Sequence, residues 1–408
     1  MTDPIVVVGA SLAGAKAVEA LRDSGYDGSL VLLGAEPHPP YERPPLSKGH
    51  LLGTAELESA FVNDAGWYDE HEVELMTGTE VTELDTRGHR VLVGATPQSY
   101  SKLLLTTGCS PRRMPLAEQH GAPVTYLRTM EDSARIKAAL RPGSRVVVIG
   151  GGWIGLEVAA AARTVGADAA VVESLDLPLL RVLGGEVAEI FAGLHREHGV
   201  DLRLSAEVTA VERTRDRAVV RLADGAAVEA DLVVVGVGVA PNTALAESAG
   251  LDTDNGILVD EHLRTSDPDV YAAGDVASVQ HPVLGQRVRV EHWDNAIGQG
   301  TVAGQNLAGR EVAYERLPYF FTDQYDLGME YVGYVPRSGY DSVVLRGDTT
   351  DSRVFTAFWL REGTVLAGMQ ANDWDATEQI RQLVGRHVDP AKLQDPGVSL
   401  ADLAGSLR

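Results

Sequence analysis

The strongest constraint on the fold is a repeat: a short apolar run followed by a glycine-rich turn occurs twice. Ile5–Val8 is followed by Gly9-Ala-Ser-Leu-Ala-Gly14, and residues 146–149 are followed by Gly150-Gly-Gly-Trp-Ile-Gly155. Both runs are rich in β-branched residues, as buried parallel strands are. Alanine-rich stretches typical of helices follow at 12–24 and 153–165, and further apolar strands at 30–33 and 169–172. Two such strand–turn–helix–strand units predict an α/β protein with two Rossmann-like dinucleotide-binding domains.

The order of later elements indicates how these domains are connected. Strands are predicted at 102–106 and 232–235, each followed by glycine and soon by proline, with a hairpin pattern at 218–230 before the second strand. The second domain is therefore predicted to be inserted into the first. Its residues would be 113–244, and those of the host domain 1–112 and 245–318. A meander-like segment with a helix at 375–383 predicts a C-terminal α+β domain over 319–408.

The second turn has the GxGxxG spacing in the required context, with a strand before it and a helix after it. Gly150 permits the tight turn, Gly152 lets a pyrophosphate approach the helix N-terminus, and Gly155 lets helix and strand pack. Glu173 ends the next strand, where an acid can accept from a ribose hydroxyl. No lysine or arginine follows in residues 174–176 to hold a 2′-phosphate, which favours NADH over NADPH. The alternative is that the glycines serve packing alone.

The first turn departs from the pattern because Ser11 stands in place of the middle glycine. A serine still permits close approach, so a second dinucleotide is predicted. Glu36, beyond the next strand, could hold the ribose or be a solvated loop acid; Ala35 cannot hold it. A later strand ends in Gly274-Asp275, where the acid could bind near a pyrophosphate or cap a helix. A flavin in the host domain facing a nicotinamide in the inserted domain is the expected pairing.

Three further segments carry a family resemblance across essentially the whole chain. Tyr41-Glu-Arg-Pro-Pro-Leu-Ser-Lys48 resembles a PYxRPPLSK motif, Glu291-His-Trp-Asp-Asn-Ala296 a segment beside an isoalloxazine, and Pro318-Tyr-Phe-Phe-Thr-Asp-Gln-Tyr325 a FWSDQY motif. They resemble FAD-dependent, NADH-dependent ferredoxin reductases of the putidaredoxin reductase and biphenyl-dioxygenase ferredoxin reductase type. These share the two-dinucleotide fold of glutathione reductase. Phe321 stands where many members have tryptophan, so it could be a plain core residue, as could Trp293.

The resemblance implies roles for particular residues. Lys48, paired with Glu157, would lie near the flavin ring as the catalytic cation, because a preorganised positive charge stabilises a reduced flavin. Arg43 would contact FAD, Asp275 would hold the ribityl–pyrophosphate region, and Trp293 would pack near the ring. The full set of expected FAD and NADH contacts is Gly9, Ser11, Leu12, Ala13, Gly14, Glu36, Arg43, Lys48, Thr107, Gly108, Gly150, Gly152, Ile154, Gly155, Glu173, Gly238, Gly274, Asp275, Glu291, His292, Trp293 and Phe321.

The single cysteine, Cys109, excludes a disulfide relay, and the segment after the second strand, residues 44–48, contains no thiol. Cys109 is expected to be structural. The reduced flavin must then pass its electrons to an outside acceptor, and the resemblance implies an iron–sulfur ferredoxin serving a cytochrome P450 or a ring-hydroxylating dioxygenase. Two alternatives remain: an NADH oxidase or quinone or dye reductase, and a non-catalytic FAD- and NADH-binding sensor.

The net charge of −23 disfavours nucleic acid and anionic membrane as partners. Because ferredoxins are typically acidic, docking would need a local basic patch, with Arg310, Arg316 and Arg337 as candidates. No signal peptide or membrane span is evident, so a cytoplasmic protein is expected. A monomer or weak homodimer is expected as its oligomeric state. The spacing of the histidines at 195, 198 and 292 predicts no metal site.

Overall fold

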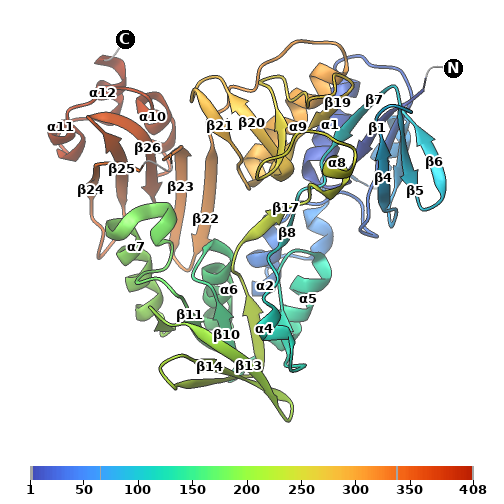
Figure 1. Cartoon of the computed structure of the whole chain (residues 1–408). Coiled ribbons are helices and arrows are strands. Elements are labelled where there is room, and N and C mark those ends of the chain that lie inside the picture. The colour runs from blue at the N-terminus through green and yellow to red at the C-terminus, as the bar shows by residue number, and fades with distance from the viewer. Residues whose placement is uncertain (1–2, 65, 337–338, 407–408) are drawn as a thin grey trace. The chain divides into compact units, whose positions relative to one another are not determined.

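The computed structural model describes residues 3–64, 66–336 and 339–406. The chain divides into two compact units (Figure 1), each described below by itself. Unit 1 consists of Met1–Arg43, Glu58–Ser110 and Val239–Pro318, and unit 2 of Pro44–Leu57, Pro111–Gly238 and Tyr319–Arg408. The short segment Pro44–Leu57 therefore packs with the inserted part of the chain, which the sequence pattern did not indicate.

Unit 1 is built on a parallel sheet that carries the first glycine turn. In spatial order its strands are β19 (Val270–Ala272), β7 (Lys102–Leu105), β1 (Ile5–Val8), β2 (Leu30–Leu33) and β3 (Val73–Met76). Helix α1 (Leu12–Asp23) packs along α9 (Trp293–Leu307), as Figure 1 shows. A Cβ on Gly300 would lie 2.4 Å from the carbonyl oxygen of Ala13, so the two helices touch through their backbones.

Smaller elements complete unit 1. They are the antiparallel strands β4 (Val81–Asp85), β5 (Arg90–Val93) and β6 (Thr96–Ser99), the sheet β18 (Ile257–Val259), β20 (Ala277–His281) and β21 (Gln286–Val288), and the helices α3 (Trp67–Glu70) and α8 (Ala244–Ser248). Where the chain passes between the units, β8 (Cys109–Pro111) pairs with β17 (Val239–Pro241).

Unit 2 repeats the parallel arrangement around the second glycine turn. Its strands are ordered β12 (Asp201–Arg203), β11 (Asp168–Val172), β10 (Arg145–Ile149), β16 (Leu232–Val235) and β9 (Val124–Thr125). The predicted hairpin forms a sheet of β13 (Val208–Thr214), β14 (Arg217–Leu222) and β15 (Ala227–Ala230). The helices are α2 (Gly49–Leu52), α4 (Pro115–Glu118), α5 (Met130–Ala139), α6 (Trp153–Thr164) and α7 (Leu180–Glu197).

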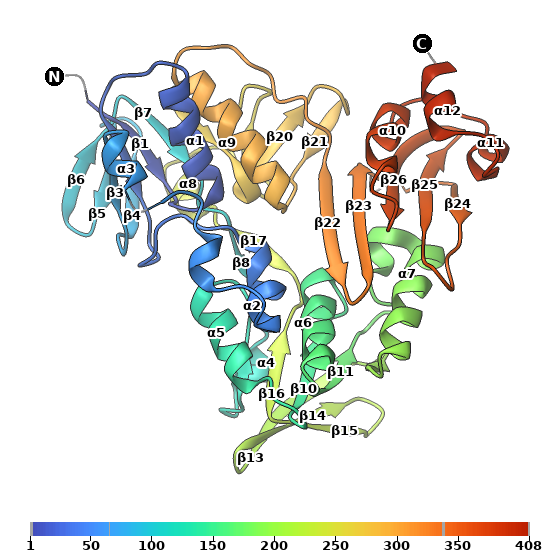
Figure 2. The same cartoon turned by 180° about the vertical axis from the view of Figure 1, so that it is seen from behind.

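The C-terminal segment of unit 2 forms an antiparallel sheet. Its order is β22 (Tyr319–Gln324), β23 (Leu327–Gly333), β26 (Thr364–Ala371), β25 (Phe355–Arg361) and β24 (Ser342–Gly347). Figure 2 shows α10 (Ala376–Leu383), α11 (Pro390–Gln394) and α12 (Leu400–Ser406) gathered beside this sheet.

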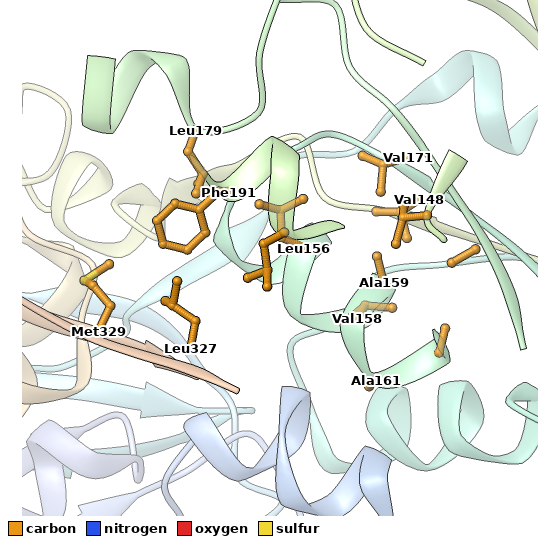
Figure 3. Close-up of a cluster of buried hydrophobic side chains, with 14 of the residues drawn as sticks. Val148, Leu156, Val158, Ala159, Ala161, Val171, Leu179, Phe191, Leu327 and Met329 are labelled. Carbon is orange, nitrogen blue, oxygen red and sulfur yellow. The ribbon is translucent and has the colours of Figure 1, made fainter. Parts of the chain in front are cut away.

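A continuous core joins these parts of unit 2. Leu156 on α6 and Phe191 on α7 lie in one buried cluster with Leu327 and Met329 on β23 (Figure 3). The buried Trp359 donates its indole N–H to the carbonyl oxygen of Leu183 at 2.9 Å. Burial of this apolar surface holds β23 in one core with α6 and α7.

The predicted α/β class with two Rossmann-like sheets and a C-terminal α+β region is confirmed. The errors are at element ends. The strand predicted at 102–106 ends at Leu105. The helix predicted at 375–383 begins at Ala376, with Asp375 as its N-cap.

Candidate functional site

The glycine turn of unit 1 brings β1 and the start of α1 together. Gly9 has φ 121°, and a Cβ there would lie 2.2 Å from the carbonyl oxygen of Thr106. A Cβ on Gly14 would lie 2.3 Å from the carbonyl oxygen of Gly9. Ser11 occupies the N-cap of α1, and its side chain makes no capping hydrogen bond within the described chain. The first-turn N–H groups, at Leu12 and Ala13, have no partner inside the helix, so this end fits a phosphate.

The acid beyond β2 is tied to the first family motif. Glu36 accepts a hydrogen bond from Arg43 Nη2 at 2.9 Å and another, very short, from the Tyr41 hydroxyl. Arg43 Nη1 also lies 3.1 Å from the Tyr41 oxygen. Burial raises the pKa of Tyr41, so it remains a neutral donor. Tyr41 and Arg43 thus hold the Glu36 carboxylate in place, so Glu36 is not a freely solvated loop acid.

Two loops complete the unit 1 candidates. Thr107 donates to the carbonyl oxygen of Asn242 at 2.8 Å and Asn242 Nδ2 donates back to Thr107 at 2.7 Å, which pins the turn at Gly108, where φ is 65°. Gly274, with φ 80°, donates its N–H to Gln299 at 2.8 Å, and a Cβ there would lie 3.0 Å from the Cβ of Ala13. This loop therefore lies against the first turn of α1.

Asp275 lies inside a short 3₁₀ helix, Gly274–Val276, whose N-cap residue is Ala273. The alternative that Asp275 caps a helix is therefore wrong. At the start of α9 it is His292 that caps, because its ring nitrogen accepts from the N–H of Asp294 at 3.4 Å.

The neighbours of His292 differ in exposure. Glu291 is exposed and pairs with Arg289 at 2.6 Å. Trp293 is partly buried at the first helical position, so it is not a fully buried core residue.

The glycine turn of unit 2 is closer to the ideal pattern. Gly150 has φ 109°, with a Cβ position 2.3 Å from the carbonyl oxygen of Gly236, and a Cβ on Gly155 would lie 2.1 Å from the carbonyl oxygen of Gly150. Packing therefore requires glycine at both positions. Gly152 is different: it is the N-cap of α6, and apart from its chain neighbours no described atom lies within 4 Å of its Cβ position. This open space before a helix N-terminus fits a pyrophosphate.

Three further candidates belong to unit 2. Glu173 accepts from the N–H of Gly151 at 2.6 Å and of Leu175 at 2.9 Å, which fixes its carboxylate beside the turn. Ile154, in the first turn of α6, is 44% exposed. Gly238 follows β16 with φ 98°.

The second candidate centre of unit 2 is a buried carboxylate with its donors. Glu157 is 4% exposed, and its Oε1 accepts from Lys48 Nζ at 2.7 Å and from the Thr322 hydroxyl at 2.6 Å. Its Oε2 accepts from the Ser47 hydroxyl at 2.5 Å. Three donors, one of them cationic, stabilise the ionised carboxylate in a buried position. The pairing of Lys48 with Glu157 that the resemblance implied is present.

Side chains from β22 surround this pair. Lys48 Nζ lies 5.2 Å from the centroid of the Phe321 ring, within cation–π range, and Phe321 is only partly buried. Burial is the main cause of a raised pKa at Asp323, and Lys48 opposes that shift. Ser47 and Thr322 were not among the predicted site residues, although each lies within one of the motifs and its hydroxyl was the available signal.

Cys109 is 3% exposed and makes no disulfide. Its sulfur accepts from Arg289 Nη1 at 3.3 Å and lies 3.5 Å from the carbonyl oxygen of Asp275. Within the described ranges, no group of three or more His, Cys, Asp or Glu side chains could hold a metal ion. None of the described helices is long and apolar enough to span a bilayer.

Comparisons with known proteins give one consistent answer. The model of the pyridine nucleotide-disulphide oxidoreductase family matches residues 3–300, and that of the reductase C-terminal family matches residues 319–404. The chain is 40% identical over 402 residues to the anthranilate 1,2-dioxygenase system ferredoxin–NAD(+) reductase component of Burkholderia cepacia, covering 98% of each chain. It is 40% identical to rhodocoxin reductase of Rhodococcus erythropolis over 369 residues, or 90% of this chain and 86% of that one.

A solved structure agrees. The reductase in the crystal structure of the covalent putidaredoxin reductase–putidaredoxin complex matches with a TM-score of 0.94 and 35% identity, over 99% of each chain. The chain therefore belongs to the pyridine nucleotide-disulphide oxidoreductase family, and within it to the ferredoxin–NAD(+) reductases that end in a reductase C-terminal domain.

Proposed function

We propose that this enzyme moves hydride from NADH to FAD and then delivers single electrons to an iron–sulfur ferredoxin that serves a cytochrome P450 or a ring-hydroxylating dioxygenase. FAD, when bound, supplies the exchange between two-electron and one-electron chemistry. The relatives support this assignment: one is named for a dioxygenase system, and a structural match is a reductase joined to putidaredoxin.

The residues present fit both dinucleotides. In unit 1 the first turn of α1, with Ser11, would bind the FAD pyrophosphate, and Glu36, positioned by Arg43, would bind its ribose. The loops at Thr107–Gly108 and Gly274–Asp275 lie at the carboxyl ends of β7 and β19, where ligands bind in open α/β sheets.

In unit 2 the open position at Gly152 would take the NADH pyrophosphate. Glu173, already fixed by two backbone N–H groups, would accept from the ribose. Residues 174–176 carry no cation for a 2′-phosphate, so we expect discrimination against NADPH.

One observation carries the proposal: the helix whose N-terminus would hold NADH also carries the acid that holds the flavin-facing lysine. Gly152 is the N-cap of α6, and Glu157, on the same helix, binds Lys48 at 2.7 Å. A rigid helix would thereby couple the position of the nicotinamide to that of a cation. Lys48 would stabilise negative charge as it accumulates on the flavin, in a site where Glu157 keeps the ammonium in one place.

The electrons must leave the chain, because its lone thiol is buried against Arg289 and the segment 44–48 has none. An acidic ferredoxin would need a local basic patch against the net charge of −23. Among the candidates, Arg316 pairs with the buried Asp294, which leaves Arg310 as the stronger choice, and Arg337 lies outside the described residues. We place the enzyme in the cytoplasm as a monomer or weak homodimer.

The test is anaerobic reduction of the purified holoenzyme by NADH and by NADPH, followed by mixing with a panel of ferredoxins and with air-saturated buffer. We expect NADH to be the better donor and a ferredoxin to reoxidise the flavin faster than oxygen does. Reoxidation by oxygen at the ferredoxin rate would favour the oxidase alternative, and a flavin that NADH cannot reduce would favour the sensor.

A further inference from the structure

A line of polar side chains continues from Glu157 into the core of unit 2, beyond the residues given roles above. The Thr322 hydroxyl, which donates to Glu157 at 2.6 Å, lies 3.2 Å from Gln324 Nε2. Gln324 Oε1 in turn lies 2.8 Å from His195 Nε2 on α7. Thr322 and Gln324 are each 1% exposed and His195 is 0% exposed. A polar line this deep is costly unless every member has its partner.

The donor and acceptor roles along this line follow from the carboxylate. Ionised Glu157 only accepts, so Thr322 gives it its single hydroxyl proton and must accept from Gln324. The amide NH₂ of Gln324 therefore faces Thr322, and its carbonyl oxygen faces His195. A flipped amide would set the carbonyl oxygen against a hydroxyl whose proton is already used. His195 must then carry its proton on Nε2.

The surroundings of His195 agree with this tautomer. Its Nδ1 is buried and, among the described residues, has no hydrogen-bond partner, so a proton there would be left unsatisfied. Burial lowers the pKa of His195 to about 4, with the Gln324 hydrogen bond opposing that shift. His195 is therefore neutral near pH 7, with Nε2–H as its single donor.

From this geometry we propose that Gln324 and His195 are positioning residues: they fix the Thr322 hydroxyl as a donor to Glu157 and so set how the carboxylate holds Lys48. This rests on the proposed function, in which Lys48 faces the flavin. Without Gln324 and His195 the Thr322 hydroxyl would no longer be fixed as a donor to Glu157, and the carboxylate, with less of its negative charge compensated, would hold the Lys48 ammonium more tightly. The reduced flavin would lose stabilisation from its nearest cation.

The experiment compares four holoenzyme variants with the wild type. Gln324→Leu and His195→Phe remove the line, His195→Gln keeps an N–H donor of similar reach, and Gln382→Leu changes an exposed glutamine on α10 as the matched control. The readouts are the FAD midpoint potential, the rate of flavin reduction by NADH, the NADH concentration at half-maximal rate, and the melting temperature.

We expect Gln324→Leu and His195→Phe to make the midpoint potential more negative and to slow flavin reduction about 3- to 10-fold, the effect of one lost hydrogen bond. The half-saturating NADH concentration should stay within about twofold. His195→Gln should keep the midpoint potential and the rate of flavin reduction close to their wild-type values, and Gln382→Leu should change neither quantity. Selective ¹⁵N-histidine NMR of the wild type should show His195 as the Nε2–H tautomer.

Variants that lower the melting temperature but leave potential and reduction rate at wild-type values would overturn the proposal, since a purely structural role predicts that result. So would an Nδ1–H tautomer of His195. Failure of the proposed function looks different: the wild type itself would then not be reduced by NADH.

Discussion

Lys48 is the cation proposed to stabilise the negative charge of the reduced flavin. Its ammonium is held at 2.7 Å by a carboxylate that is 4% exposed, with two hydroxyls completing the site. The lysine and its acid could be predicted because a motif resemblance pointed to them. The hydroxyls of Ser47 and Thr322 lie within the same motifs, but the line from Thr322 to His195 could not be predicted, because no local pattern links residues so far apart in the sequence.

Replacing this cation should slow flavin reduction without abolishing cofactor binding. For Lys48→Met we expect a fall of about 10- to 100-fold in the rate of anaerobic flavin reduction, because a preorganised charge is lost from a desolvated site. Lys392→Met, at an exposed position on α11, is the matched control. A Lys48→Met rate within twofold of the wild type, measured by stopped-flow absorbance, would contradict the assigned role.

Glu173 should set the preference for NADH. Glu173→Gln keeps the side chain's size but removes the charge that two backbone N–H groups and the ribose share. We expect the Kd for NADH to rise about 10-fold, as for one charge-assisted hydrogen bond, while the Kd for NADPH changes less. Titration of flavin fluorescence would measure both constants, and equal weakening of the two would argue against ribose recognition.

His195 should make stability depend on pH in a defined direction. Its folded-state pKa of about 4 lies below the unfolded value of 6.5, so the unfolded state binds more protons between these values. Stability from this group is then complete above about pH 6.5 and falls as the pH drops toward 4, by about 2 kcal/mol between pH 7 and 5.

The measurement is the melting temperature of wild type and His195→Gln at both pH values. The melting temperature of the wild type should fall more between pH 7 and pH 5 than that of the variant, which lacks the imidazole. Parallel loss in the two proteins would show that His195 is protonated in the folded state as well.

At the scale of elements, the strand–turn–helix units were predictable because glycine spacing and β-branched runs have direct physical causes. Gly9, Gly150 and Gly155 sit where a Cβ would collide with a carbonyl oxygen at 2.1 to 2.3 Å. The kink of α7 at Gly184, with φ 76°, was not predicted; a Cβ there would lie 1.8 Å from the hydroxyl of Tyr340, a neighbour far away in the sequence. The packing of Pro44–Leu57 with unit 2 is likewise decided by tertiary contacts.

Replacement by alanine should have opposite effects on stability at two helical glycines, because only one of them lies at the close contact between α1 and α9. Gly300→Ala would place a methyl 2.4 Å from the carbonyl oxygen of Ala13, so we expect a loss of about 1 to 3 kcal/mol and a lower FAD content. A Cβ at Gly193 on α7 would meet no described atom within 4 Å beyond its chain neighbours and the backbone of its own helix, so Gly193→Ala should stabilise the protein by about 0.5 to 1 kcal/mol. Thermal unfolding and flavin absorbance report both; a neutral Gly300→Ala would contradict the close helix contact.

As a whole molecule, the chain receives electrons in pairs from NADH and releases them singly to a ferredoxin. The repeat predicted both dinucleotide sites, and the lone cysteine predicted that no sulfur relay lies between them. The identity of the acceptor came only from resemblance and relatives, because a docking surface for an acidic partner leaves no clear mark on a chain of net charge −23.

Removal of the thiol tests the absence of a relay. Cys109→Ala should retain wild-type rates of flavin reduction and of ferredoxin reduction, with a modest stability loss of about 1 kcal/mol for the smaller buried side chain and the lost Arg289 contact. Steady-state ferredoxin reduction is the measurement, and loss of that activity in a variant that still binds FAD would mean that sulfur takes part.

The visible spectrum of the purified protein during anaerobic titration with NADH tests the flavin assignment itself. We expect a yellow protein whose flavin absorbance is bleached by about one equivalent of NADH and recovers when a suitable ferredoxin is added. A colourless polypeptide that FAD cannot reconstitute would contradict it.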